Sequence, residues 1–132
     1  MKPAHIPIFV KIAGLYNLAL SLGLFVPVMQ RLMGLNVTDQ ALAKVIGVLL
    51  VYTAVVQYFA SFDVKKYAWI IFWEGLLRWS AAFILIYYGL WGHLGFMAAV
   101  LGVVDFAIGC VYIFVIPKAF SVSRSQLLRP HQ

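Results

Sequence analysis

The sequence predicts an all-α integral membrane protein, an antiparallel four-helix bundle in a single transmembrane domain that covers residues 1–132. Two observations predict this class. Hydrophobic residues make up 64% of the chain and charged residues only 11%, whereas soluble domains are about 45–50% apolar and about 25% charged. The apolar residues also fall into separate segments of about 20 residues or more, the length that a helix needs to cross about 30 Å of hydrocarbon.

The expected helices cover residues 8–33, 41–62, 67–88 and 94–116. The segments between and after them are 31–40, 61–66, 89–93 and the polar tail 118–132. Thr38 or Asp39 is expected to cap the second helix, because their side chains accept hydrogen bonds from free backbone N–H groups. Lys11 and Asn17 interrupt the first segment, which is also longer than the core of a signal peptide, so it is predicted to stay as a membrane helix.

Basic residues near the ends of the segments predict the orientation. One side of the membrane receives Lys2, Lys11, Lys65, Lys66, Lys118, Arg124 and Arg129. The other side receives only Arg31 and Lys44. By the positive-inside rule both termini are cytoplasmic. The net charge of +6 is explained by contact with anionic lipid headgroups, where each Lys or Arg gains about 1 kcal/mol, and needs no nucleic acid.

Each expected helix carries one stripe of small or polar residues at helical spacing. The stripes are Lys11, Gly14, Asn17 and Ser21; Lys44, Gly47, Ala54, Tyr58 and Ser61, with Gln57 beside them; Glu74, Arg78 and Ala81 or Ala82; and Gly102, Asp105, Gly109 and Tyr112. In lipid, helices associate through small residues and interhelical hydrogen bonds. The stripes are therefore expected to meet inside the bundle.

Charged residues near the middle of the membrane are the strongest functional signal in the chain. Glu74 lies four residues before Arg78, and both lie, with Asp105, within about 5 Å of the expected midplane at about 1.5 Å of rise per residue. Such residues are rare and costly in lipid and are functional candidates by default. The polar-core and ligand-binding candidates are Glu74, Arg78, Asp105, Asn17, Tyr52, Gln57 and Trp73.

The charge of this cluster leaves several roles open. Two carboxylates and one guanidinium carry one net negative charge, so one acid is expected to hold a proton unless a cation joins them. Glu74 and Asp105 are predicted to converge on Arg78. The cluster then serves as a structural clasp, as a binding site, or in proton or ion movement or catalysis.

No cofactor or metal is expected. Cys110 has no second cysteine with which to form a disulfide, and the histidines lack metal-ligand spacing. Phosphate-binding glycine loops and nucleophile motifs are absent from the sequence.

Short motifs resemble a family. They are the Lys-Ile-Ala-Gly-Leu-Tyr-Asn run at 11–17, the Gly47, Tyr52, Tyr58 and Asp63 pattern, the Gly75-Leu-Leu-Arg78 step and Asp105. Together they resemble the DoxX-like group of small bacterial four-helix membrane proteins. The resemblance implies a bacterial inner-membrane protein of about this size and supplies no catalytic residues.

A looser resemblance is to the EXPERA-type fold of sterol isomerases, in which acidic and aromatic side chains act inside a helical bundle. It implies that Glu74 and Asp105, with Trp73 and Tyr52, would protonate an isoprenoid double bond and stabilise the resulting cation. Arg78 departs from that pattern because it would repel a bound cation, so an anionic or neutral polar headgroup is favoured.

Two classes of function follow as expectations. The first is a bundle that binds a lipid-like or hydrophobic small molecule, or an accessory subunit that binds a partner in a membrane complex. The second is an enzyme, such as an EXPERA-like isomerase, or a proton-coupled carrier, which would need a homo-oligomer to form a pathway. A pocket that opens to the charged cluster would distinguish a site from a packed clasp.

Overall fold

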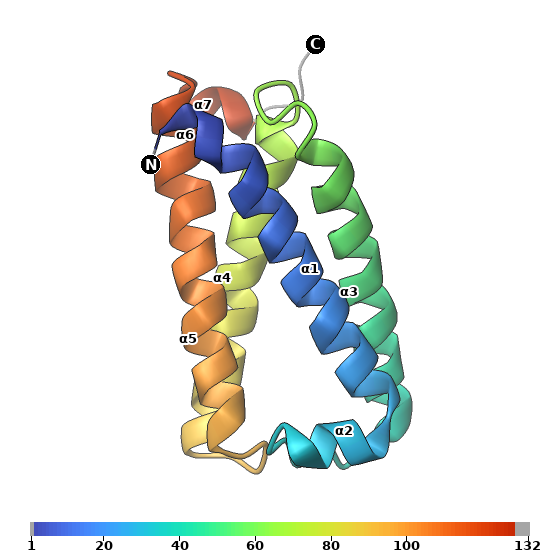
Figure 1. Cartoon of the computed structure of the whole chain (residues 1–132). Coiled ribbons are helices and arrows are strands. Elements are labelled where there is room, and N and C mark those ends of the chain that lie inside the picture. The colour runs from blue at the N-terminus through green and yellow to red at the C-terminus, as the bar shows by residue number, and fades with distance from the viewer. Residues whose placement is uncertain (1, 129–132) are drawn as a thin grey trace.

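The computed structural model describes residues 2–128 and is all-helical over that range (Figure 1). Its elements are η1 (Pro3–His5), α1 (Ile6–Phe25), α2 (Pro27–Leu32), α3 (Gln40–Ala60), α4 (Ala68–Leu90), α5 (Phe96–Cys110), η2 (Val111–Val115), α6 (Ile116–Ala119) and α7 (Arg124–Leu127). The predicted all-α class is confirmed. Arg129 and the last part of the expected tail, 129–132, lie outside the described residues.

Within the described residues, four helical stretches are long and apolar enough to cross a membrane. They are Pro3–Phe25, Gln40–Ala60, Ala68–Leu90 and Phe96–Ala119. Large apolar side chains are exposed along these stretches, for example Leu15 at 63% and Phe83 at 61%. Exposed apolar surface of this extent marks contact with a partner or with lipid. The helices therefore indicate an integral membrane protein.

The expected first helix, 8–33, is wrong at its end. The structure ends α1 at Phe25 and places Val26 in an extended conformation, with φ −116° and ψ 113°. Pro27 follows, and the ring of a proline disfavours the helical conformation for the residue before it. Pro27 then starts the short helix α2, where its missing N–H costs nothing. Asp39 caps α3 as expected, because its Oδ1 accepts a hydrogen bond from Leu42 N at 3.0 Å.

The long helices associate as two close pairs, α1 with α3 and α4 with α5 (Figure 1). Glycines make both contacts close. A Cβ at Gly14 would lie 3.2 Å from the carbonyl oxygen of Ala54, and one at Gly102 would lie 2.9 Å from the carbonyl oxygen of Ala82. The predicted stripes of small residues thus pack mainly within pairs, as expected for helices that associate in lipid.

The two pairs meet at the end of the molecule that carries the N-terminus and diverge towards α2 (Figure 1). Near the N-terminus an apolar cluster joins them. Its members are Ile6, Val10, Ala13, Ala60, Val64, Ile71, Tyr112 and Ile116. At the opposite end the pairs touch through their loops, where Asn36 N donates to Leu94 O at 3.0 Å. Gln30 and Gln40 exchange side-chain hydrogen bonds of 3.1 and 2.9 Å there, which hold α2 against α3.

The last long helix contains one turn of π-helix, Val111–Val115, in which Ile116 N donates to Val111 O five residues back. Pro117 explains this turn, because a proline ring inside a helix clashes with the carbonyl four residues earlier. After α6 the chain folds back, and Leu127 of α7 is buried against Phe72 and Ile113. Part of the expected polar tail therefore packs on the helices.

Candidate functional site

Seven polar side chains from all four long helices form two hydrogen-bonded groups that the Glu74–Arg78 ion pair joins into one network, which we call the polar seam. Its members are Asn17 of α1, Thr53 and Gln57 of α3, Glu74 and Arg78 of α4, Asp105 of α5 and Tyr112 of η2. Three of its hydrogen bonds run from one helix pair to the other. The seam is therefore the polar part of the interface between the pairs.

Arg78 lies at the centre of the seam, with only 4% of its side chain exposed. Its Nη1 donates to Asp105 Oδ1, and its Nη2 donates to Asn17 Oδ1 at 2.8 Å. Its Nε lies 3.7 Å from Glu74 Oε1 and is buried without a hydrogen-bond partner. Both carboxylates thus converge on this guanidinium, in the arrangement that the sequence predicts.

Gln57 links the seam to the apolar cluster. Its Nε2 donates to Glu74 Oε1 at 2.7 Å, and its Oε1 accepts from the hydroxyl of Tyr112 at 3.4 Å. The π-helical turn carries Tyr112, whose side chain is fully buried with its ring 5.8 Å from the Arg78 guanidinium carbon. π-turns within α-helices are frequent at functional sites.

The structure brings five of the seven candidates together: Asn17, Gln57, Glu74, Arg78 and Asp105. Tyr52 is not one of the hydrogen-bond partners expected of the cluster, because its side chain is 68% exposed on the outer surface of α3. Thr53, the next residue, takes the inward position and accepts a hydrogen bond from Asn17 Nδ2 at 3.0 Å. A step of one residue turns a helix by about 100°. Trp73 is 49% exposed and lies outside the seam.

Thr53 and Tyr112 are seam residues that the sequence reasoning did not select as site candidates. Thr53 lies four residues before Gln57, a spacing that puts both on one face of a helix. That spacing could have identified it. Tyr112 follows Asp105 on the same predicted stripe and lies in the π-turn.

A groove between α3 and α4 reaches the polar seam from the outer surface. Its volume is about 600 Å³, within the range of about 300–1,000 Å³ found for small-molecule sites. Its lining residues are Leu49, Tyr52, Thr53, Val56, Trp69, Ile70, Trp73, Glu74 and Leu77. Glu74 supplies the only charge in this lining. Trp69 lines this groove together with Tyr52 and Trp73, the two sequence-based candidates that lie outside the seam.

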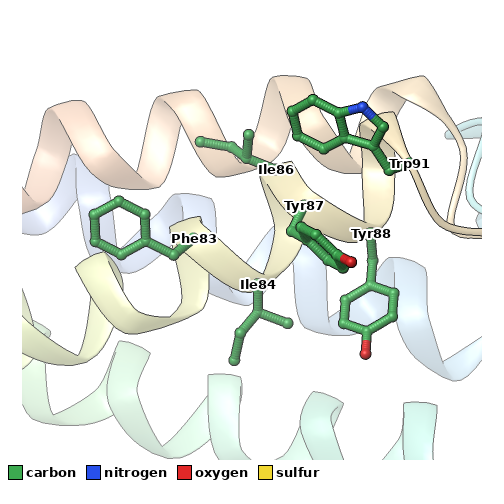
Figure 2. Close-up of a pocket in the computed structure, with 6 residues that line it drawn as sticks. All are labelled: Phe83, Ile84, Ile86, Tyr87, Tyr88 and Trp91. Atoms are coloured by element: carbon green, nitrogen blue, oxygen red, sulfur yellow. The ribbon is translucent and has the colours of Figure 1, made fainter.

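A second concave surface lies at the other end of α4. Figure 2 shows its lining side chains, Phe83, Ile84, Ile86, Tyr87 and Tyr88 of α4 and Trp91 just after its end. Tyr87 packs edge to face against Tyr88, and Trp91 is 74% exposed. Aromatic side chains of this kind favour the boundary between membrane and water. The surface therefore fits an interfacial belt better than a ligand pocket.

Among the described residues, no group of three or more His, Cys, Asp or Glu side chains could hold a metal ion. The charged groups of the seam are two carboxylates and one guanidinium.

The four apolar helices of the described residues and the buried charges between them indicate a small helical integral membrane protein with a polar interior. Comparisons of the chain with protein-family models, curated proteins and solved structures find no match. The resemblance to DoxX-like proteins stays a prediction, and the function has to be inferred from the geometry of the seam and its groove.

Proposed function

We propose that this chain is an antiparallel four-helix membrane protein that binds an amphipathic molecule in the α3–α4 groove, with the polar end of the ligand at Glu74. The ligand would enter sideways from the bilayer. The groove supports this entry, because Leu49 and Leu77 on its walls are 58% and 55% exposed on the lipid-facing surface.

The observation that carries this proposal is the position of Glu74 at the junction of groove and seam. Its side chain is 12% exposed, whereas Arg78 is 4% exposed and does not line the groove. A carboxylate offers about four acceptor positions. Gln57 donates to Glu74 Oε1, and Arg78 and Asn17 are its other polar neighbours. The groove therefore presents an acceptor, and a ligand with a hydroxyl or amine headgroup fits it best.

This geometry changes the headgroup that we favour. The sequence-based preference for an anionic or neutral headgroup depended on Arg78 facing the ligand. In the structure the guanidinium donates to Asp105 and Asn17, away from the groove lining. We therefore retain the neutral hydrogen-bond donor, add the amine and no longer favour the anion.

The incomplete hydrogen bonding of the seam supports a binding role over a purely structural clasp. Arg78 Nε of the seam is buried without a hydrogen-bond partner, as are the Tyr16 hydroxyl and Trp79 Nε1 outside the seam. Buried polar groups are nearly always satisfied, and each exception needs an explanation. A clasp that served only stability would gain by pairing these groups.

The orientation is part of the proposal. In Figure 1 the N-terminus, the α3–α4 loop and α6 lie at one end of the molecule, which brings Lys2, Lys65, Lys66 and Lys118 to that end. The positive-inside rule places this end in the cytoplasm. A location in a bacterial inner membrane rests on the DoxX-like resemblance alone.

Three probes with the same 16-carbon chain test the groove: hexadecylamine, hexadecanol and hexadecanoate. Native mass spectrometry of the full chain in detergent would measure how much of each probe stays bound. We expect the amine and the alcohol to be retained about tenfold better than the carboxylate, because a hydrogen bond to a charged group contributes about 1.5–3 kcal/mol. Equal retention of all three would contradict the proposal.

Matched variants locate the bound probe. Glu74→Ala should abolish the preference for the amine, and Leu49→Trp should lower retention of every probe by filling the groove. Asp63→Asn removes an exposed loop carboxylate outside the groove, and Val103→Trp adds an indole to an exposed position on α5. Both controls should behave like the unaltered protein. If the controls and the groove variants act alike, the probes bind elsewhere.

A further inference from the structure

A second groove lies between α1 and α3, on another face of α3 from the first. Its volume is about 230 Å³, below the range of about 300–1,000 Å³ for small-molecule sites. Its lining residues are Lys11, Gly14, Leu15, Leu18, Ala54, Val55, Tyr58 and Phe59. Gly14 and Ala54 are small, buried members of this lining. The groove therefore suits part of an acyl chain rather than a whole ligand.

Lys11 brings a positive charge to this groove. Its Nζ lies 4.7 Å from the ring centre of Phe62 and 5.6 Å from that of Tyr58. Phe62 follows the end of α3, so the lysine side chain extends towards the N-terminal end of the molecule. Long cationic side chains near helix ends extend in this way towards the headgroup layer.

The charge of Lys11 is not matched by an acid. Within residues 2–128, no carboxylate lies within ion-pair distance of its Nζ. Asp63 in the adjacent loop accepts a hydrogen bond from Lys66 N at 3.1 Å. Lys65 and Lys66 in the same loop leave that end of the molecule positively charged.

We propose that this groove binds one anionic phospholipid, with a single acyl chain between α1 and α3 and the headgroup phosphate on Lys11. Charge complementarity supports this occupant, because basic pockets between membrane helices on the cytoplasmic side bind anionic headgroups, and the orientation proposed above, on which this inference rests, places Lys11 near that side. The site is independent of the α3–α4 groove, which presents a carboxylate. The two grooves therefore select lipids of opposite headgroup chemistry.

The full chain, exchanged into mixed micelles of phosphatidylglycerol and phosphatidylcholine, provides the test. Native mass spectrometry would count the lipids that remain bound to the protein. We expect one phosphatidylglycerol to be retained preferentially. Lys11→Gln should reduce this retention about fivefold, which corresponds to about 1 kcal/mol, and Lys11→Arg should preserve it.

Further variants separate the groove from general charge attraction. Lys44→Gln removes an exposed lysine at the opposite end of α3 and should have no effect. Leu15→Trp, at a position 63% exposed on the groove wall, should lower retention while Lys11 is intact. The proposal fails if Lys44→Gln acts like Lys11→Gln, if Leu15→Trp has no effect, or if phosphatidylcholine is retained equally. Saturable binding of glycerol 3-phosphate, which lacks an acyl chain, would also overturn it.

Discussion

The contacts within each helix pair differ in kind from the contacts between the pairs. Within the pairs, glycines at positions such as 14 and 102 bring backbones close enough that a Cβ would lie within about 3 Å of a facing carbonyl oxygen. Between the pairs, hydrogen bonds of the polar seam, one apolar cluster and the loop hydrogen bond from Asn36 N to Leu94 O make the contact. Lipid supplies no hydrophobic drive for helices to associate. The seam and the cluster therefore both join the pairs, and the α3–α4 groove lies beside the seam.

The largest loss in the free energy of unfolding is expected from Arg78→Leu, which disrupts the contact between the pairs. The substitution removes both hydrogen bonds of the guanidinium and leaves Glu74 and Asp105 without a positive charge. Loss of one partner from a buried ion pair costs about 3–5 kcal/mol. Unfolding of the variant by denaturant in bicelles would measure the loss. The double variant Arg78→Leu with Asp105→Leu should recover part of the lost free energy of unfolding. A loss below about 1 kcal/mol for Arg78→Leu alone would show that the seam does not hold the pairs together.

A smaller loss in the free energy of unfolding is expected from Ile71→Ala in the apolar cluster. Ile71 is 1% exposed and lies among residues from both pairs. Truncation leaves a cavity, which costs about 2–3 kcal/mol at sites of this kind. Ile84→Ala, on the same helix but 57% exposed, is the matched control and should stay within about 0.5 kcal/mol. Equal losses from the two variants in the same unfolding assay would contradict the role of the cluster.

Within a pair, Gly102→Val should destabilise the α4–α5 contact. Its Cβ would lie 2.9 Å from the carbonyl oxygen of Ala82 and 2.9 Å from a side-chain carbon of Ile86. Overpacking of this kind costs about 1–3 kcal/mol. Spin labels on α4 and α5 should also report a greater separation in this variant. Val103→Leu, at the exposed neighbouring position, should change neither the unfolding free energy nor the separation.

The smallest effect is expected at the α2 end, from Gln30→Ala. The amide of Gln30 donates to Leu24 O at 2.7 Å and exchanges hydrogen bonds with Gln40. Net loss of such hydrogen bonds costs about 1 kcal/mol. Hydrogen exchange should become faster in α2 and the 34–36 loop and stay unchanged in α4. Faster exchange throughout the chain would mean that α2 supports the whole fold.

The sequence predicts much of the fold because membrane helices obey simple length and composition rules. Four apolar stretches, the cap at Asp39 and the convergence of Glu74 and Asp105 on Arg78 follow from hydropathy, side-chain chemistry and helical spacing. The end of the first helix was predicted wrongly although Pro27 is present in the sequence, because the apolar stretch continues past this proline. The π-turn before Pro117 was missed for the same reason.

The sequence by itself therefore determined the number of long apolar helices in the described residues and the face on which most of the charged residues lie. Only the tertiary structure decided which faces meet. It turned Thr53 inward in place of Tyr52, directed Arg78 away from the groove and left Glu74 at its edge. The physical reason is that helical spacing locates a stripe to within about one residue, or about 100°. The exact rotation depends on contacts with all the neighbouring helices at once.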